Sequence, residues 1–184
     1  MKDLSLNLLD IAENSVKAEA TLTQLLLTQE GDILTFQVVD DGKGMTEEVL
    51  KGVVDPFYTT RTTRKVGLGL PLLRMAAEMT GGTMEVQSRH RDTHPDDHGT
   101  VVTAVFHTDH IDCPPVGDLV ATVTTLIQGH PDTDFYFCHS IEGEKVELDT
   151  RELRQVLGEV SLAEFEVLQW ISGFLTDQYN GEET

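Results

Sequence analysis

Two glycine-containing stretches of the sequence combine residue types that can hold a flat, charged ligand. The first, DDGKGM at 40–45, follows the apolar run 33–39 and places a carboxylate before two glycines spaced by one residue. Such glycines let the backbone turn sharply and come close to a ligand. An ionised aspartate only accepts hydrogen bonds, so Asp40 suits an exocyclic amine such as the one on adenine. On its own the stretch is weak evidence, because an Asp-Gly pair more often marks a plain turn.

The second stretch, VGLGL at 66–70, leads directly into an apolar helix expected at 70–79. Gly67 and Gly69 at a helix N-terminus leave backbone N–H groups free for an anion, and the helix dipole favours negative charge there. Three basic residues stand just upstream, where they can contact phosphates: Arg61, Arg64 and Lys65. The pattern matches neither GxxxxGK[ST] nor GxGxxG, so it predicts a different way of holding a triphosphate.

A third candidate element is the helix expected at 3–17. In helical projection Asp10, Asn14 and Lys17 fall in one narrow polar slot, and apolar side chains fill most of the remaining circumference. A solvated stripe is the ordinary explanation, but such stripes are wider and richer in Lys and Glu. The amide oxygen of Asn14 suits Mg²⁺, which prefers oxygen ligands. Asp10, one turn earlier, could orient or deprotonate a water or a hydroxyl.

Hydrophobic periodicity and turn signals predict the elements that must position these residues. Helices are expected at 3–17, 70–79, 117–128, 150–158 and 161–178, with a short one after Thr46. Strands are expected at 21–28, 33–39, 83–88, 100–107, 134–141 and 145–148, the first two forming an antiparallel hairpin. The segment 55–70 reads as a mobile loop and 89–99 as an exposed one. Gly81-Gly82 should end the helix at 70–79.

The strand-like pattern of the sequence ends at residue 107, where a linker candidate containing two adjacent prolines begins. We therefore divide the chain into residues 1–110 and a small, acidic α+β region, 111–184. Five large apolar residues near the end are expected to be mainly core, with a docking face as the alternative: Leu162, Phe165, Leu168, Trp170 and Phe174. The pattern His107-x-x-His110-x-x-Cys113 has zinc-ligand types, but a fourth ligand is not obvious, so a metal site is disfavoured.

Composition excludes several classes of protein. The formal net charge of -19 repels nucleic acid and anionic lipid, so neither is expected as a partner. No apolar run approaches the ~18 residues of a membrane span. The first residues do not resemble a signal peptide, and two cysteines do not make a disulfide framework. A cytoplasmic protein is the simplest expectation.

The order of these motifs resembles the ATP-binding domain shared by DNA gyrase B, Hsp90, histidine kinases and MutL. The resemblance is to six landmarks in order: the N box (ENSVKA, 13–18), the G1 box (DDGKGM, 40–45), the F box typical of histidine kinases (DPFYTTR, 55–61), the G2 box (GLGL, 67–70), Gly81-Gly82 and Gly99-Thr100. It spans about residues 3 to 108 and leaves the last third unexplained. One departure is Lys65, which stands where GxGLGL has its first glycine.

The resemblance implies an α+β fold, a two-layer sandwich with helices on one face of a mixed sheet and ATP held between helices and a lid over 46–66. By carry-over Asn14 binds Mg²⁺, Asp40 reads the adenine amine, and Thr100 supports Asp40 through a shared water. The remaining residues implied to contact the nucleotide are Lys17, Gly42, Gly44, Met45, Phe57, Thr60, Arg61, Lys65, Gly67, Leu68, Gly69 and Leu70.

Two functions stay open at this point. No histidine stands in the sequence context of a phospho-acceptor helix, so one hypothesis is a histidine-kinase-like protein that phosphorylates a separate partner protein. The other is a nucleotide-controlled binding switch or slow ATPase that regulates a partner by lid closure. An acidic residue four positions before Asn14 points to hydrolysis or hydroxyl phosphorylation with Asp10 as the base, whereas the F box points to histidine-kinase ancestry. Homo-oligomer formation is left open.

Overall fold

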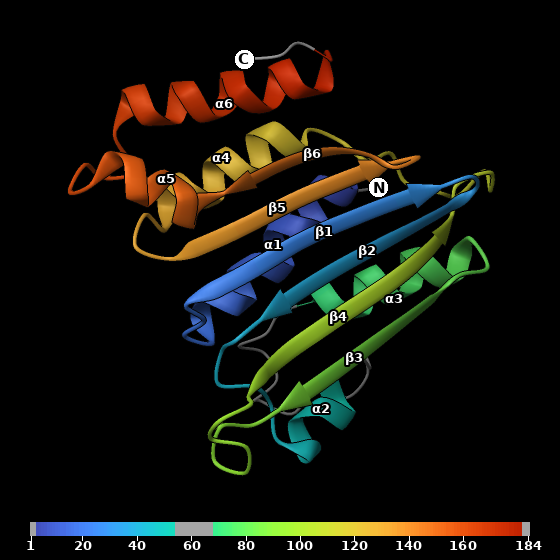
Figure 1. Cartoon of the computed structure of the whole chain (residues 1–184). Coiled ribbons are helices and arrows are strands. Elements are labelled where there is room, and N and C mark those ends of the chain that lie inside the picture. Colours follow the sequence, from blue (N-terminus) through green and yellow to red (C-terminus); the bar gives the residue numbers. More distant parts are fainter. Residues whose placement is uncertain (1–2, 54–67, 182–184) are drawn as a thin grey trace.

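The computed structural model describes residues 3–53 and 68–181, and a six-stranded sheet lies at its centre (Figure 1). The strands are β1 (Leu22–Glu30), β2 (Ile33–Asp40), β3 (Thr83–Arg89), β4 (Gly99–His107), β5 (Asp134–Ile141) and β6 (Glu144–Asp149). Their order across the sheet is β3-β4-β2-β1-β5-β6. Neighbouring strands are antiparallel except β1 and β5, which run parallel. The sheet is therefore mixed.

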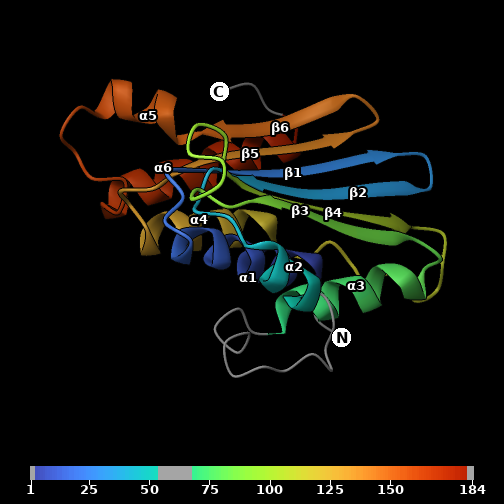
Figure 2. The same ribbon diagram turned by 90° about the horizontal axis from the view of Figure 1, so that it is seen from below.

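The described residues also form six helices. They are α1 (Leu4–Lys17), α2 (Glu47–Val53), α3 (Gly69–Met79), α4 (Leu119–Gly129), α5 (Thr150–Leu157) and α6 (Phe165–Tyr179). Figure 2 shows α1, α3 and α4 together on the same side of the strands. Helix α6 contacts edge strand β6 and packs on α4. The predicted two-layer α+β fold is confirmed. No described helix is long and apolar enough to cross a bilayer.

The alternation of β2 sets both the core and the position of the first glycine stretch. Leu34, Phe36 and Val38 are buried on the helix-covered face, and strand side chains alternate between faces, so Asp40 projects to the same side. Register then pairs Asp40 with Thr100 at the start of β4. A carboxylate and a hydroxyl consequently lie side by side at the end of the apolar core.

The last third of the chain continues the same sheet. After α4, strand β5 pairs in parallel with β1 from Leu22↔Asp134 to Gln29↔Ile141, and β6 pairs with β5. The largest fully buried side chains come from both parts of the chain: Phe36, Phe106, Phe135 and Phe137. The predicted boundary near residue 110 therefore falls between β4 and α4 without separating two sheets or two cores. The sequence pattern did not reveal the β1–β5 pairing.

Local capping and turn predictions agree with the structure where it describes them. The hairpin of β1 and β2 is confirmed, Thr46 accepts a hydrogen bond from the N–H of Val49 at the start of α2, and α3 ends before Gly81, whose φ is +82°. The core prediction for the last helix was partly wrong. Leu162 and Leu168 are buried, but Trp170 is 51% and Phe165 is 70% exposed, because α6 buries only the side that faces α4.

Candidate functional site

A pocket of about 550 Å³ lies at the end of the sheet where β2 ends and β4 begins. We call it the α1 pocket, since α1 forms one wall; the others come from segment 43–49, the start of α3 and β4. Seven residues that the sequence singled out line it: Asn14, Lys17, Asp40, Gly44, Met45, Leu70 and Thr100. The N box, the G1 box and the Gly-Thr pair of β4 are thus brought to one place, although up to 86 positions separate Asn14 and Thr100 in the sequence.

The carboxylate of Asp40 is held in a fixed orientation. One oxygen, Oδ2, accepts a hydrogen bond from the hydroxyl of Ser15 at 2.7 Å, and the other, Oδ1, accepts one from the backbone N–H of Gly42 at 2.9 Å. Burial raises the pKa of Asp40, and the hydrogen bonds from Ser15, Gly42 and Thr100 offset part of that rise. Asp40 is therefore a positioned acceptor in a poorly hydrated place.

The neighbouring Asp41 has the opposite environment. It projects to the other side of the strand end, is exposed, and accepts hydrogen bonds from the backbone N–H groups of Thr21 and Leu22 at 2.7 and 3.0 Å and from the Thr21 hydroxyl. Although burial acts to raise it, the hydrogen bonds from Leu22 and Thr21 hold the pKa of Asp41 below its usual value. Asp41 ties the strand ends together, which leaves Asp40 as the carboxylate of the pocket.

Gly44 is required by the close approach of the β3–β4 connection. Its φ is +71°, and a Cβ at this position would lie 2.0 Å from the carbonyl oxygen of Arg89. The N–H of Arg91 in turn donates to the carbonyl of Lys43 at 2.9 Å. The segment after β3 is therefore pressed against the G1 box, which explains why this wall of the pocket needs a residue without a side chain.

The hydroxyl of Thr100 belongs to a small polar network beneath the pocket. Its Oγ1 lies 2.8 Å from the Oγ of Ser88, which also accepts a hydrogen bond from the N–H of Met45 at 2.7 Å. The network connects β3, β4 and the G1 box. The position of Met45 in the pocket wall is fixed by this contact.

Four predicted residues are described but do not line the α1 pocket: Asp10, Gly42, Leu68 and Gly69. A Cβ built at Gly69 would be 3.5 Å from the Cβ of Asp10, so the first residue of α3 packs against α1 at that position. Leu68, just before α3, is 59% exposed. Gly42 contributes its backbone N–H, which donates to Asp40 as described above. Five predicted ligand-binding residues lie outside the described residues: Phe57, Thr60, Arg61, Lys65 and Gly67.

The described residues contain no group of three or more His, Cys, Asp or Glu side chains that could hold a metal ion. This includes His107, His110 and Cys113. A divalent ion in the α1 pocket would therefore depend on the Asn14 amide oxygen together with oxygens of a ligand and water, a donor set that suits Mg²⁺.

Sequence reasoning missed two side chains of this site. Ser15 was assigned to the apolar arc of α1, yet its hydroxyl faces Asp40; a lone serine in that arc was the available signal. His90 was assigned to an exposed loop, yet its side chain is 20% exposed and lines the α1 pocket. No local signal could have placed His90, because its position follows from the β3–β4 register that pairs Arg89 with Gly99.

Fold and pocket together define an ATP-binding domain, and comparison with protein families agrees. The model for histidine kinase-, DNA gyrase B- and HSP90-like ATPases matches residues 2–110, more than half of the 184 residues. The chain therefore belongs to this family, as its sequence motifs predict.

Curated proteins similar to this chain include a sensor protein and sensor histidine kinases. The chain is 28% identical over 94 residues to the sensor protein KdpD of Clostridium acetobutylicum, 32% over 99 residues to the sensor histidine kinase YvrG of Bacillus subtilis, and 31% over 88 residues to the sensor histidine kinase ZraS of Klebsiella oxytoca. These matches cover 48%, 50% and 48% of the chain but only 10%, 16% and 19% of the three relatives.

A solved structure matches over the whole length. The MutL ATPase domain of Aquifex aeolicus, complexed with ADP, has a TM-score of 0.52 to this chain, at 12% identity, and the match covers 100% of this chain and 71% of that one. At this identity the likeness shows the fold alone. The likeness includes the residues beyond 110, which the family model does not match.

Proposed function

We propose that the chain binds ATP in the α1 pocket and transfers the γ-phosphoryl group to a separate partner protein. The observation that carries the proposal is the partly buried, oriented carboxylate of Asp40 on the wall of a pocket that Asn14 and Lys17 also line. Membership of the ATPase family and the sensor kinases among its relatives support it.

Asp40 selects adenine in this proposal. An ionised carboxylate accepts a hydrogen bond from the N6 amine of adenine. Guanine presents its O6 oxygen at the same place, so O6 and the carboxylate oxygen of Asp40 would both be acceptors without a donor. The Ser15 hydroxyl and the Gly42 N–H keep the carboxylate oriented before the base arrives. Because a mismatched buried polar group is costly, ATP should bind much more tightly than GTP.

The triphosphate is assigned to the side of the pocket formed by α1 and α3. Asn14 would hold Mg²⁺, which neutralises phosphate charge, and Lys17 would contact a phosphate directly. The N-terminus of α3, an 11-residue helix, contributes the favourable end of its dipole near Gly69. These local cations and dipoles oppose the general repulsion from a chain of net charge -19. The phosphate contacts predicted for Arg61, Lys65 and Gly67 belong to the same proposal.

In the transfer step the bond between the γ-phosphorus and its bridging oxygen breaks, ADP leaves, and a bond forms to the acceptor. With a histidine acceptor the ring nitrogen attacks through its lone pair and no base is needed. With a serine or a water the hydroxyl proton must go to a base, and Asp10 is the candidate. The proposal places the acceptor on a separate protein; the seven histidines of this sequence are all described, and each lies outside the helices. The free cysteines Cys113 and Cys138 are compatible with the cytoplasm as the place of reaction.

A nucleotide-controlled switch is the second candidate function, and one contact favours it. The ring Nε2 of His130, at the end of α4, lies 2.8 Å from the carboxylate of Glu13, the residue before Asn14. A nucleotide that displaces the end of α1 would therefore act on α4 and, through it, on α6. In this version ATP and ADP stabilise different arrangements that a partner distinguishes.

The two functions are tested by incubating the chain with ATP labelled in the γ-phosphate and with isolated phospho-acceptor domains of sensor kinases. Transfer predicts label on the acceptor, with acid-labile label indicating phosphohistidine and acid-stable label phosphoserine. Asp10→Asn should abolish transfer to serine or water but leave transfer to histidine unchanged. Label that stays on ATP, together with a partner affinity that differs between ATP and ADP, would contradict transfer and support the switch.

A further inference from the structure

The single tryptophan of the chain lies at the surface in an aromatic pair. Trp170 is 51% exposed and stacks on Phe174, with ring centroids 4.8 Å apart and planes inclined by 11°. The pair forms one wall of a pocket of about 630 Å³ between α5, α6 and the face of β5 and β6 that α1, α3 and α4 leave open. We call it the α6 pocket. Exposed aromatic side chains that border a hollow are typical of interaction sites.

The opposite walls of the α6 pocket are acidic. Carboxylates of Glu147, Asp149 and Glu152 line it. Tyr136 donates its hydroxyl to Glu147 at 2.6 Å, and this hydrogen bond raises the pKa of Tyr136, so Tyr136 keeps its proton and remains the donor. Asp149 is partly neutralised by Arg151, with Nη2 2.8 Å from Oδ2. Glu152 is exposed, and its charge interacts with that of the neighbouring Arg151 without a hydrogen bond between described residues.

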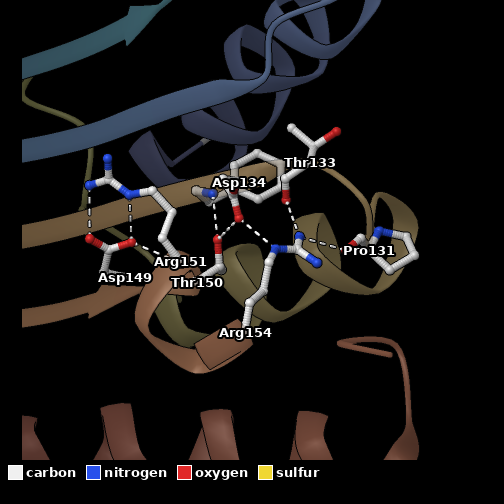
Figure 3. Close-up of polar contacts among 8 residues, drawn as sticks. Pro131, Thr133, Asp134, Asp149, Thr150, Arg151 and Arg154 are labelled. Carbon is white, nitrogen blue, oxygen red and sulfur yellow. Dashed lines mark hydrogen bonds and ion pairs between the residues drawn. The ribbon is translucent and has the colours of Figure 1, made fainter. Parts of the chain in front are cut away.

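The walls are held in place before any ligand binds. Figure 3 shows Arg154 of α5 donating to the carboxylate of Asp134 at 2.7 Å, while Thr150 donates to the same oxygen at 2.9 Å. These contacts fasten α5 to the start of β5. The side chain of Gln178 on α6 bonds both the N–H and the carbonyl of Glu147, each at 3.0 Å. The pocket therefore needs little ordering when it is filled, which favours binding.

We propose that the α6 pocket binds an arginine side chain from a basic segment of a partner protein. A guanidinium is planar, stacks on aromatic faces, and donates in a fork to carboxylates, so it matches an indole in a pocket that an exposed carboxylate also lines. Its plane lies on the Trp170 ring, and its N–H groups meet Glu152. A lysine ammonium lacks the plane and is more strongly hydrated. The net charge of -19 also attracts a basic partner and speeds the encounter.

This inference does not rest on the proposed function. The α6 pocket shares no lining residue with the α1 pocket, and a chain that bound no nucleotide could still bind an arginine there. The reverse also holds, so the two proposals can fail separately.

The aromatic half of the proposal is tested with the whole chain and a fluorescently labelled hexa-arginine peptide, followed by anisotropy at physiological salt. Trp170→Ala should weaken binding about fivefold, as expected for loss of a cation–π contact. Phe165→Ala is the matched control, because Phe165 is a more exposed aromatic residue of the same helix that does not line the pocket. Because Trp170 is the only tryptophan of the chain, intrinsic fluorescence of the wild type reports on the α6 pocket, and binding of the peptide should change it.

The charged half is tested by Glu152→Gln against Glu166→Gln. Both remove one exposed carboxylate, so general attraction falls equally, and only Glu152 lines the pocket. We expect Glu152→Gln to weaken binding about two- to fivefold more than its control, and hexa-lysine to bind more weakly than hexa-arginine. Equal effects within either pair, equal binding of the two peptides, or no binding would overturn the proposal. A Trp170 signal that changes when the chain is concentrated alone would assign the pocket to a second copy and also overturn it.

Discussion

The sheet holds two pockets of similar volume, one beside β2 and β4 and one beside edge strand β6 and its neighbour β5, and they are built in different ways. The α1 pocket, of about 550 Å³, depends on backbone: the strand end at Asp40 and the close approach at Gly44 shape it. The α6 pocket, of about 630 Å³, depends on side chains that α5, α6 and the open face of β5 and β6 contribute. A pocket shaped by the backbone, such as the α1 pocket, limits which residue types can stand at its positions. A pocket shaped by side chains, such as the α6 pocket, requires only that its helices be arranged correctly.

The two pockets also lie in different parts of the chain. The family model ends at residue 110, and every described residue lining the α6 pocket follows it. The same core nevertheless supports both. Phe137 of β5 and Leu25 of β1 are both buried, and they are register partners in the parallel pair that joins the last third of the chain to the rest of the sheet. The comparison therefore predicts two independent sites on one folding unit.

The largest expected effect comes from a substitution in the hydrophobic core that underlies both pockets. Phe137→Ala should lower the free energy of unfolding by about 3–5 kcal/mol, since it leaves a cavity in a fully buried position. Trp170 fluorescence and far-UV circular dichroism should report one coincident denaturant transition, because the sheet is continuous. The control Val156→Ala, at an 86% exposed position, should change stability by less than about 0.5 kcal/mol. If Trp170 fluorescence changed at a lower denaturant concentration than the circular dichroism signal, the chain would instead contain two independently unfolding units.

The next effect separates the backbone pocket from the side-chain pocket. Gly44→Ala introduces a Cβ at φ +71° and 2.0 Å from the Arg89 carbonyl oxygen, so it should cost about 1–3 kcal/mol and lower ATP affinity at least about tenfold. Gly31→Ala has a similar φ, +57°, but open space around it. Gly31→Ala should therefore lower stability through backbone strain but leave ATP affinity unchanged. Hexa-arginine binding should be unchanged in both, and calorimetric titration of ATP decides the comparison.

The contrast also explains how much could be predicted from the sequence. Gly44 and Asp40 were recognisable because a residue type at a strand end reports a backbone requirement that local sequence shows. Trp170 was predicted mainly as core, since an amphipathic pattern gives the apolar residues but not which helix covers them. His90 and the pairing of β1 with β5 depend on register between segments distant in sequence. Local patterns therefore gave the elements and the backbone site, and tertiary pairing determined the rest.

The smallest effect concerns the two carboxylates that face the two pockets. Burial raises the pKa of Asp40, so the folded state favours its protonated form, and the unfolding free energy should rise as pH falls toward that raised pKa. The hydrogen bond and charge of Arg151 lower the pKa of Asp149, so its stabilisation exists above about pH 4 and is lost as pH falls through its lowered value. At pH 7, Asp40→Asn should stabilise the chain, and Asp149→Asn should destabilise it by at most about 1 kcal/mol. Urea titrations at several pH values measure both, and effects of the same sign would contradict the assignment.

The most direct test of the account is calorimetric titration of ATP, ADP and GTP, with and without Mg²⁺, into the wild type and Asp40→Asn. We expect the wild type to bind both adenine nucleotides, to bind ATP more tightly with Mg²⁺, and to discriminate against GTP. Asp40→Asn should remain folded and lose adenine affinity at least about a hundredfold, since a charged acceptor of the base is removed. Adenine nucleotide binding that survives Asp40→Asn unchanged, or that is absent from the folded wild type, would contradict the central claim.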